Sequence, residues 1–186
     1  MESFASLIKN RRSTRKFTER LLNPDQVEMI LKAALMAPAS KRSNPWRFVV
    51  VEEKEMLSKL AACKKQGASF LEGCALAIVV LGNVMESDVW IEDASIASIY
   101  MQLQAEDLGL GSCWCQIRNR QTEDDTDSNE YVRQLLNIPY QLEVLSIIGF
   151  GYKDQERKPF DESHLQWEKV YLGSYPVVEQ DKTEEA

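Results

Sequence analysis

The stretch Arg11-Arg12-Ser13-Thr14-Arg15-Lys16-Phe17 says most about the fold and the ligand of this chain. Together with Lys9 it holds five of the 22 basic residues and no acidic residue, although the formal net charge of the chain is −7. Guanidinium groups are forked donors of fixed charge, and a hydroxyl adds one more hydrogen bond, so the stretch is suited to a phosphate. The alternative is a solvated basic surface with Phe17 as a packing residue. A positive island in a negative chain favours the specific anion site.

Size and composition predict one globular domain. The chain has 186 residues, of which 44% are hydrophobic and 27% charged, close to an average soluble protein. A chain of this length can bury a sufficient core without disulfides or a structural metal. We expect a single domain over residues 1–175 and a disordered acidic tail over residues 176–186.

The composition also excludes several classes of function. An acidic chain lacks the basic face that a large nucleic-acid footprint needs. The single histidine, His164, excludes a multi-histidine metal site, and the absence of a Cys-x-x-Cys pair excludes zinc-ribbon and thioredoxin-type sites. The longest apolar run is far too short to span a membrane, and Met1-Glu2-Ser3-Phe4 does not begin a signal peptide. We therefore expect a reduced, soluble, cytoplasmic protein with no membrane partner.

The hydrophobic pattern predicts a mixture of helices and strands. The best-marked helix begins at Asn23-Pro24-Asp25-Gln26, which supplies an N-cap, a proline for the first helical position and a capping box. Residues 88–108 form the longest helical candidate, and its small residues predict a buried central helix that Gly109 and Gly111 end. Residues 121–130 are acidic and predict an exposed loop. Helices are expected at 4–8, 24–37, 54–62, 88–108 and 131–136, and strands at 46–51, 74–81, 112–117 and 142–150. This order suggests α/β or α+β without revealing strand direction.

Three further segments offer ligand contacts. The polar loop Pro38-Ala39-Ser40-Lys41-Arg42-Ser43-Asn44-Pro45-Trp46 contains an asparagine whose donor and acceptor match an imide or pyrimidine edge, although an ordinary turn is the simpler interpretation. The glycines near residue 110 follow a helix and lack a third glycine, so they are not a dinucleotide fingerprint, and the cysteines at 113 and 115 would act as small apolar residues of a strand. The segment Ile148-Gly149-Phe150-Gly151-Tyr152, followed by Arg157-Lys158-Pro159, permits close approach to a ligand, yet alone it favours a plain strand end.

Taken in this order, these segments resemble the nitroreductase family of flavin enzymes. The resemblance covers about residues 4–171, and its most specific part is the basic stretch followed by Ala37-Pro38-Ala39-Ser40 and Asn44-Pro45-Trp46-Arg47-Phe48. It implies an α+β fold with a central, mostly antiparallel sheet surrounded by helices. It also implies an intertwined homodimer with FMN bound at the interface.

The resemblance also assigns roles to residues. Those implied to hold the flavin phosphate and part of the isoalloxazine edge are Arg11, Arg12, Ser13 and Arg15, with Arg157 or Lys158 approaching from the other end. Those implied to lie against the flavin from the partner subunit are Pro38, Ala39 and Ser40, while Asn44 meets a pyrimidine edge. The backbone N–H groups of Cys115, Gln116 and Ile117 would face the flavin N5, and Gly149 and Gly151 would line the ribityl chain or phosphate. No catalytic side chain is required, because the flavin carries the chemistry.

The implied function is a reductase that uses NADH or NADPH and FMN to reduce nitro, quinone or similar acceptors in a ping-pong reaction. Alternatives are a flavin-fold protein that destroys the flavin or removes halogen, a non-catalytic binder of flavin or another phosphate ligand, and an interaction protein with a basic patch. Two features depart from the family. Arg42 and Asn44 stand where many members carry Asn and Gln, and a helical insertion that shapes the substrate pocket is missing, which predicts an open site.

Overall fold

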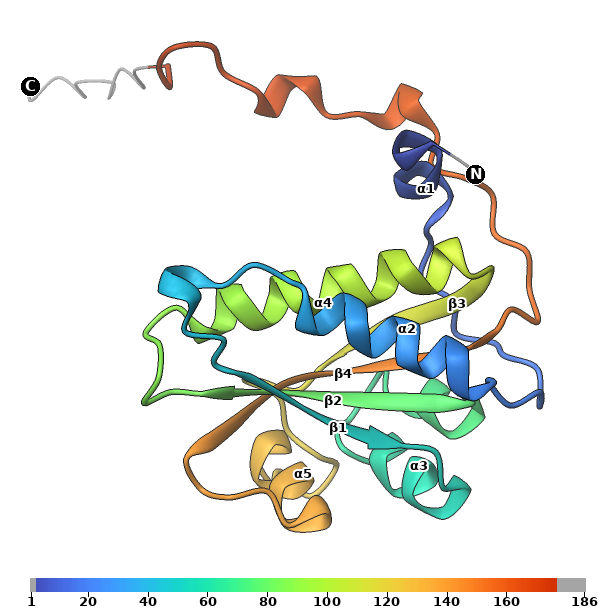
Figure 1. The fold of residues 1–186 in the computed structure, drawn as a ribbon, viewed down its shortest axis with the longest axis vertical. Helices are drawn as coiled ribbons and strands as arrows, with labels where there is room; N and C mark the ends of the chain where they lie inside the picture. Colours follow the sequence, from blue (N-terminus) through green and yellow to red (C-terminus); the bar gives the residue numbers. More distant parts are fainter. Residues whose placement is uncertain (1–2, 177–186) are drawn as a thin grey trace, which may run out of the picture.

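The computed structural model describes residues 3–176, so nearly all of the tail expected over residues 176–186 lies outside the described residues. Its centre is a four-stranded sheet in the order β1-β2-β4-β3 (Figure 1). The strands are β1 (Trp46–Val51), β2 (Leu76–Asn83), β3 (Leu110–Gln116) and β4 (Leu142–Tyr152). Every neighbouring pair is antiparallel, which confirms the predicted α+β fold with an antiparallel sheet.

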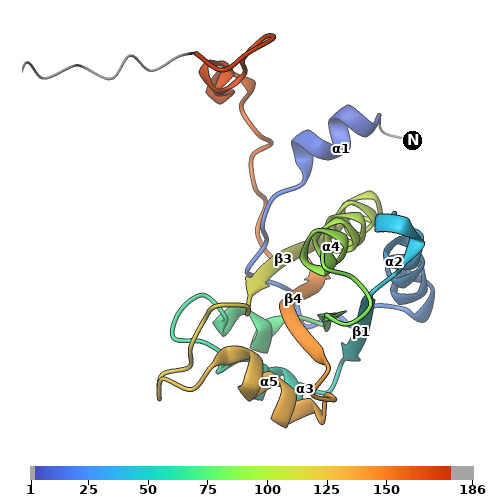
Figure 2. The same cartoon turned by 90° about the vertical axis from the view of Figure 1, so that its left-hand side faces the viewer.

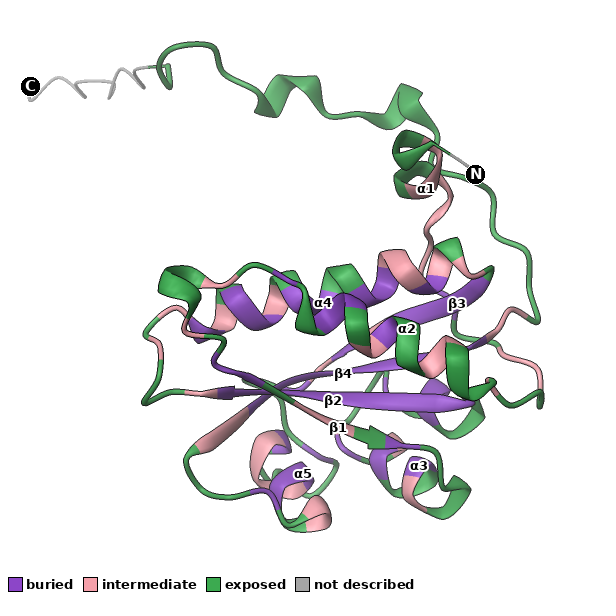
Figure 3. Ribbon diagram, viewed as in Figure 1, coloured by how far each residue is buried: buried purple, intermediate pink, exposed green. Residues whose placement is uncertain are grey.

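Helices cover both faces of the sheet. On one face lie α2 (Pro24–Leu35) and α4 (Trp90–Asp107), and on the other lie α3 (Lys54–Ala61) and α5 (Ser128–Leu136) (Figure 1). Each face has its own cluster of buried side chains, and burial is concentrated in the strands and in the helix sides that face them (Figure 3). The two inner strands, β2 and β4, are therefore buried on both faces, as the continuous apolar run of β2 predicted.

Local signals set the two helices of the first face. The side chain of Asn23 accepts a hydrogen bond from the N–H of Gln26 (2.8 Å), and the side chain of Gln26 accepts one from the N–H of Asn23 (3.1 Å), so the predicted capping box is present. Small side chains of α4, such as Ala94 and Ala97, are fully buried, which confirms a buried central helix. Gly109 has a φ of 73°, a left-handed conformation that glycine adopts easily, and α4 ends just before it.

Several predicted boundaries were wrong, and three of them have an instructive cause. Strand β2 begins at Leu76, two residues later than expected, because Cys74 still caps the 3₁₀ turn η2 (Ser69–Gly73): its N–H donates to the carbonyl of Leu71 (3.3 Å). Strand β3 begins at Leu110, so Gly111 belongs to the strand and does not end the helix. Helix α5 begins inside the expected acidic loop, because the carboxylate of Asp127 caps it by accepting a hydrogen bond from the N–H of Glu130 (3.1 Å).

Both ends of the described chain extend away from the sheet (Figures 1 and 2). Helix α1 (Phe4–Asn10) lies beside the beginning of the C-terminal arm, which we define as residues 154–176. The two segments are joined by a hydrogen bond from the N–H of Phe160 to the carbonyl of Lys9 (2.8 Å) and by an ion pair between Lys9 and Glu162 (2.9 Å). Within residues 3–176 no helix combines the length and the apolar character needed to cross a bilayer.

Candidate functional site

The basic stretch, residues 11–17, lies along the outer edge of β3 and is hydrogen-bonded to it. The N–H of Thr14 donates to the carbonyl of Ser112 (2.9 Å), and Ser13 forms a parallel bridge with the same serine. Thr14 is buried, and its side chain fills the space in front of Gly111, where an added Cβ would come within 2.7 Å of it. The glycine therefore permits the close approach that holds the neighbouring arginines in place.

These arginines line a cavity of about 720 Å³ between α1, the basic stretch and the C-terminal arm. Its polar lining includes Arg11, Arg12, Ser13, Arg15, Arg157 and Glu162. The carboxylate of Glu162 is paired with Lys9, which offsets its charge. Four guanidinium groups and a hydroxyl around one space fit the phosphate of FMN, because forked cationic donors match phosphate oxygens.

The structure separates the two cations that were left as alternatives at the C-terminal end. Arg157 lines the cavity together with Arg11 and Arg15. Lys158 is exposed and is not among the residues around this cavity. The alternative that uses Arg157 therefore agrees better with the geometry.

Strand β3 presents backbone donors on its free edge. In an antiparallel strand, N–H groups alternate between the two sides. The carbonyl of Ser112 meets Thr14 on the free side, whereas the N–H of Ile117 donates to the carbonyl of Leu145 in β4 (3.2 Å). The alternation then turns the N–H of Gln116 outward and that of Cys115 toward β4. Of the three backbone donors that the resemblance implied, Gln116 has the orientation to meet a ligand.

Buried thiols lie behind this edge. Cys113 and Cys115 belong to the core cluster on the α3 side, which agrees with their expected role as small apolar residues, and Cys63 belongs to the same cluster. A hydrogen bond from the Cys63 thiol lowers the pKa of Cys115, and the same bond raises the pKa of Cys63. Burial raises the pKa of Cys113, an effect that the nearby charge of Arg15 opposes.

Lys64 is a basic residue that acts on a thiol of β3 and that the sequence analysis did not single out. Its ammonium charge lowers the pKa of the Cys115 thiol. Its side chain lines a second cavity, of about 620 Å³, together with Asn119 and Arg120. The only signal in the sequence is the pair Lys64-Lys65 just after a helix, which is too common to single out. Arg15 lines the first cavity, and its charge opposes the rise in the pKa of Cys113. Lys64 lines the second cavity, and its charge lowers the pKa of Cys115.

The loop 38–44 does not join this cluster within one chain. It lies at the start of α4, where the N–H of Ser40 donates to the side chain of Asp93 (2.9 Å). Arg12 lies near the end of the same helix, since it shares a small cavity with Glu106. From Asp93 to Glu106 the helix rises about 20 Å at 1.5 Å per residue. Figure 1 accordingly shows the turn η1 (Ser40–Arg42) and helix α1 over opposite ends of α4.

The loop has an unusual backbone. Lys41, Arg42 and Asn44 adopt positive φ angles of 51°, 58° and 47°, a left-handed conformation that costs a residue other than glycine about 1–2 kcal/mol. Hydrogen bonds hold its second half: the Arg47 guanidinium donates to the carbonyl of Asn44 (3.0 Å), and the N–H of Asn83 donates to that of Pro45 (2.9 Å). Backbone strain that the surroundings maintain is typical of functional segments.

The placement of Gly149 and Gly151 differs from the expectation that they line the ribityl chain or phosphate. Both are buried in the inner strand β4. A Cβ on Gly149 would come within 2.8 Å of Phe70, and one on Gly151 within 2.9 Å of Phe17. Their missing side chains therefore make room for aromatic rings of this chain.

Comparison with known proteins identifies the family of the chain. The family model described as "Nitroreductase family" matches residues 8–152. A "Putative NADH dehydrogenase/NAD(P)H nitroreductase" of Archaeoglobus fulgidus is 34% identical over 161 residues, covering 84% of this chain and 89% of the relative. An iodotyrosine deiodinase of Thermotoga neapolitana is 22% identical over 188 residues, covering 89% and 96%.

A solved structure gives the same result at higher identity. The FMN-dependent nitroreductase of Clostridium difficile R20291 is 44% identical to this chain and superposes with a TM-score of 0.90. The match covers 92% of this chain and all of that one. The fold, the position of the basic stretch and the family match lead to one conclusion: the chain belongs to the nitroreductase family.

Proposed function

We propose that two copies of this chain form an intertwined homodimer that binds one FMN at each of two interface sites and reduces nitro, quinone or similar acceptors. As a member of the nitroreductase family, the chain is an NAD(P)H-dependent oxidoreductase with FMN as its cofactor. Residues 1–175 would form the single FMN-binding domain, and the reaction would follow a ping-pong scheme. A cytoplasmic location remains a prediction.

The observation that carries this proposal is the cavity of four arginines beside the free edge of β3. Arg11, Arg15 and Arg157 would hold the phosphate, and the outward N–H of Gln116 would meet the ring system. Bound FMN supplies two-electron chemistry, taking a hydride from the nicotinamide and delivering it to the acceptor. The positive charges of Arg15 and Lys64, which both act on thiols of β3, would favour the negative charge that the reduced ring carries.

The need for a second copy follows from what one chain leaves incomplete. The loop 38–44 lies about 20 Å along α4 from the arginines, so its contribution would come from the partner subunit. The segments that extend from the sheet expose large apolar side chains: Phe4 is 65% exposed, Trp167 70% and Leu172 93%. A groove of about 480 Å³ between α1 and α4, lined by Phe4, Met36 and Tyr100, is a further apolar surface that the partner would cover.

An absorbance spectrum of the purified protein, before and after addition of FMN and desalting, tests the cofactor. We expect a retained flavin spectrum that NADH or NADPH bleaches without air and that a nitroaromatic or a quinone restores. Double-reciprocal plots at several acceptor concentrations should give parallel lines, and light scattering should give a dimer. A colourless protein that retains no FMN after the addition and desalting would refute the proposal. Bleaching followed by halide release from a halotyrosine, with no nitro or quinone turnover, would replace the acceptor class with a dehalogenation substrate.

A further inference from the structure

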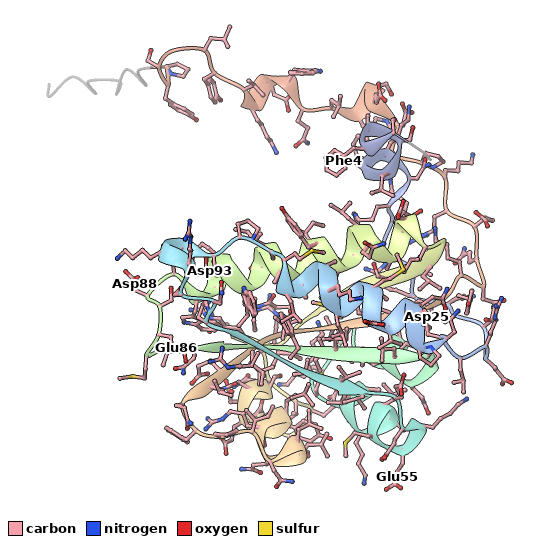
Figure 4. The ribbon with its side chains drawn as sticks, in the orientation of Figure 1. Phe4, Asp25, Glu55, Glu86, Asp88 and Asp93 are labelled. Carbon is pink, nitrogen blue, oxygen red and sulfur yellow. The ribbon has the colours of Figure 1, made fainter. Side chains whose placement is uncertain are left out.

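The buried carboxylate of Asp93 is not among the residues around the arginine cavity. Asp93 lies in the first turn of α4 and is 3% exposed. Its Oδ1 accepts a hydrogen bond from the N–H of Ser40 (2.9 Å), and its Oδ2 accepts one from the hydroxyl of Ser87 (3.4 Å). Figure 4 shows Asp93 beside the Ser40–Arg42 turn, with Asp88 and Glu86 on the segment that leads into α4. The carboxylate thus joins the loop to the central helix.

We infer that Asp93 is a positioning residue, which holds the loop 38–44 in the shape that contacts the FMN of the partner subunit. This inference rests on the proposed function. The bond to Ser40 comes directly before the left-handed residues Lys41 and Arg42. The bonds made by Arg47 and Asn83 hold the other end of the loop, at the carbonyl of Asn44 and at the carbonyl of Pro45 that follows it. Asp93 is therefore the anchor from the protein core at the entry to the strained segment.

The surroundings of Asp93 suit this role. Water is excluded from a buried carboxylate, so it does not compete for the N–H of Ser40. The first turn of a helix favours negative charge, because its free N–H groups carry partial positive charge. Helix α4 is packed against the sheet along its length, with Ala94 and Ala97 fully buried, and a rigid element positions a loop more accurately than another loop does. Inside the loop, the N–H of Ser43 donates to the carbonyl of Ser40 (2.9 Å), so the residue that Asp93 holds is also bonded to the second half of the loop.

The first test compares Asp93→Ala with Asp93→Asn, using exposed Asp88→Asn as the matched control. FMN affinity is measured by flavin fluorescence, and the bound ring is observed by visible circular dichroism. We expect Asp93→Ala to raise the Kd for FMN about tenfold and to change the dichroism of the bound flavin. Asp93→Asn keeps an oxygen acceptor, so its Kd for FMN should lie within about threefold of that of the parent. The control Asp88→Asn should have the same Kd as the parent. An Asp93→Ala protein with the parent's Kd and spectrum would overturn the inference.

A second pair of variants removes the donor, in case Asp93→Ala does not fold. Ser40→Pro deletes the N–H that Asp93 accepts, and the extended backbone of Ala39 (φ −135°, ψ 151°) suits a residue before proline. Ser40→Ala deletes the hydroxyl alone. We expect the Kd of Ser40→Pro to exceed that of Ser40→Ala at least fivefold. Equal values for the two variants would show that the N–H bond to Asp93 does not position the loop.

A mixed dimer tests whether the loop acts on the partner subunit. Asp93→Ala and Arg15→Ala subunits carrying different tags are co-expressed, and the heterodimer is purified through both tags. The number of FMN molecules bound per heterodimer is then measured at an FMN concentration that saturates neither homodimer. If the loop acts across the interface, one of the two sites has both intact parts, and the heterodimer should bind one FMN. Binding of none would mean that the loop acts within its own chain, which overturns the inference. Failure of the parent itself to bind FMN would instead refute the proposed function.

Discussion

The free edge of β3 and the loop 38–44 are two parts of one proposed site that the chain builds in opposite ways. At β3 one chain supplies all the contacts: the side chain of Thr14 packs against Gly111, and the neighbouring arginines line a cavity. The loop is strained, anchored at its ends, and lies about 20 Å along α4 from that cavity. The difference teaches that a single chain brings the arginines together around one cavity, whereas under the proposed function the loop would meet the flavin only through a second copy.

The largest expected effect concerns the β3 side of this comparison. Arg11→Ala and Arg15→Ala should each weaken FMN binding by about 1.5–3 kcal/mol, since each removes charge-assisted hydrogen bonds to the phosphate. Gel filtration followed by flavin absorbance measures the loss. Exposed Lys16→Ala is the matched control, because that lysine lies in the same stretch and is not among the residues around the cavity. Equal retention of FMN by all three variants would show that the cavity binds no phosphate.

The next largest effect concerns the contact between Thr14 of the basic stretch and Gly111 of β3. Gly111→Ala places a Cβ 2.7 Å from the side chain of Thr14, so either the stretch or the strand must shift. Such overpacking costs about 1–3 kcal/mol, which chemical denaturation would measure. Gly73→Ala is the control, since nothing lies within 4 Å of its added Cβ. If both variants unfold at the same denaturant concentration, the close approach of Thr14 to Gly111 does not hold the stretch.

A smaller effect separates the two cations at the C-terminal end. Arg157 is exposed but lines the cavity, so Arg157→Ala should weaken FMN binding by about 1 kcal/mol, as expected for a partly screened charge. Lys158→Ala should change it less, because Lys158 is not among the lining residues. Titration of the apoprotein with FMN at two salt concentrations checks both variants. The reverse ranking would return the role to Lys158 and contradict the geometry of the arm.

The smallest effect concerns the strain of the loop. Lys41→Gly relieves a φ of 51° but adds entropy to the unfolded chain, so the gain in unfolding free energy should be below about 1 kcal/mol. Thermal unfolding of the apoprotein measures it, with exposed Lys54→Gly as a control that is expected to lose stability. A loss for Lys41→Gly as large as that for Lys54→Gly would mean that the left-handed backbone carries no strain. The loop would then differ from β3 in distance alone.

The parts of the fold and site that could be predicted are those with a local cause. The capping box at Asn23 needs four consecutive residues, and the end of α4 needs one left-handed glycine. The basic stretch was likewise visible as a charge island. Lys64 was not, because its place beside Cys115 results from packing a helix end against a strand fifty residues later in the chain. The roles of Gly149 and Gly151 could not be inferred either, since the rings they accommodate come from distant segments.

By itself, the sequence determined which chemical groups this protein can offer: a cluster of arginines, capped helices around apolar strands, and a polar loop before Trp46. Only the tertiary structure decided how those groups face one another. Strand pairing turned the N–H of Gln116 outward and that of Ile117 inward, and the length of α4 separated the loop from the arginines. The physical reason is range, because capping and charge density depend on neighbours in the chain, whereas orientation and distance depend on the register of the whole sheet.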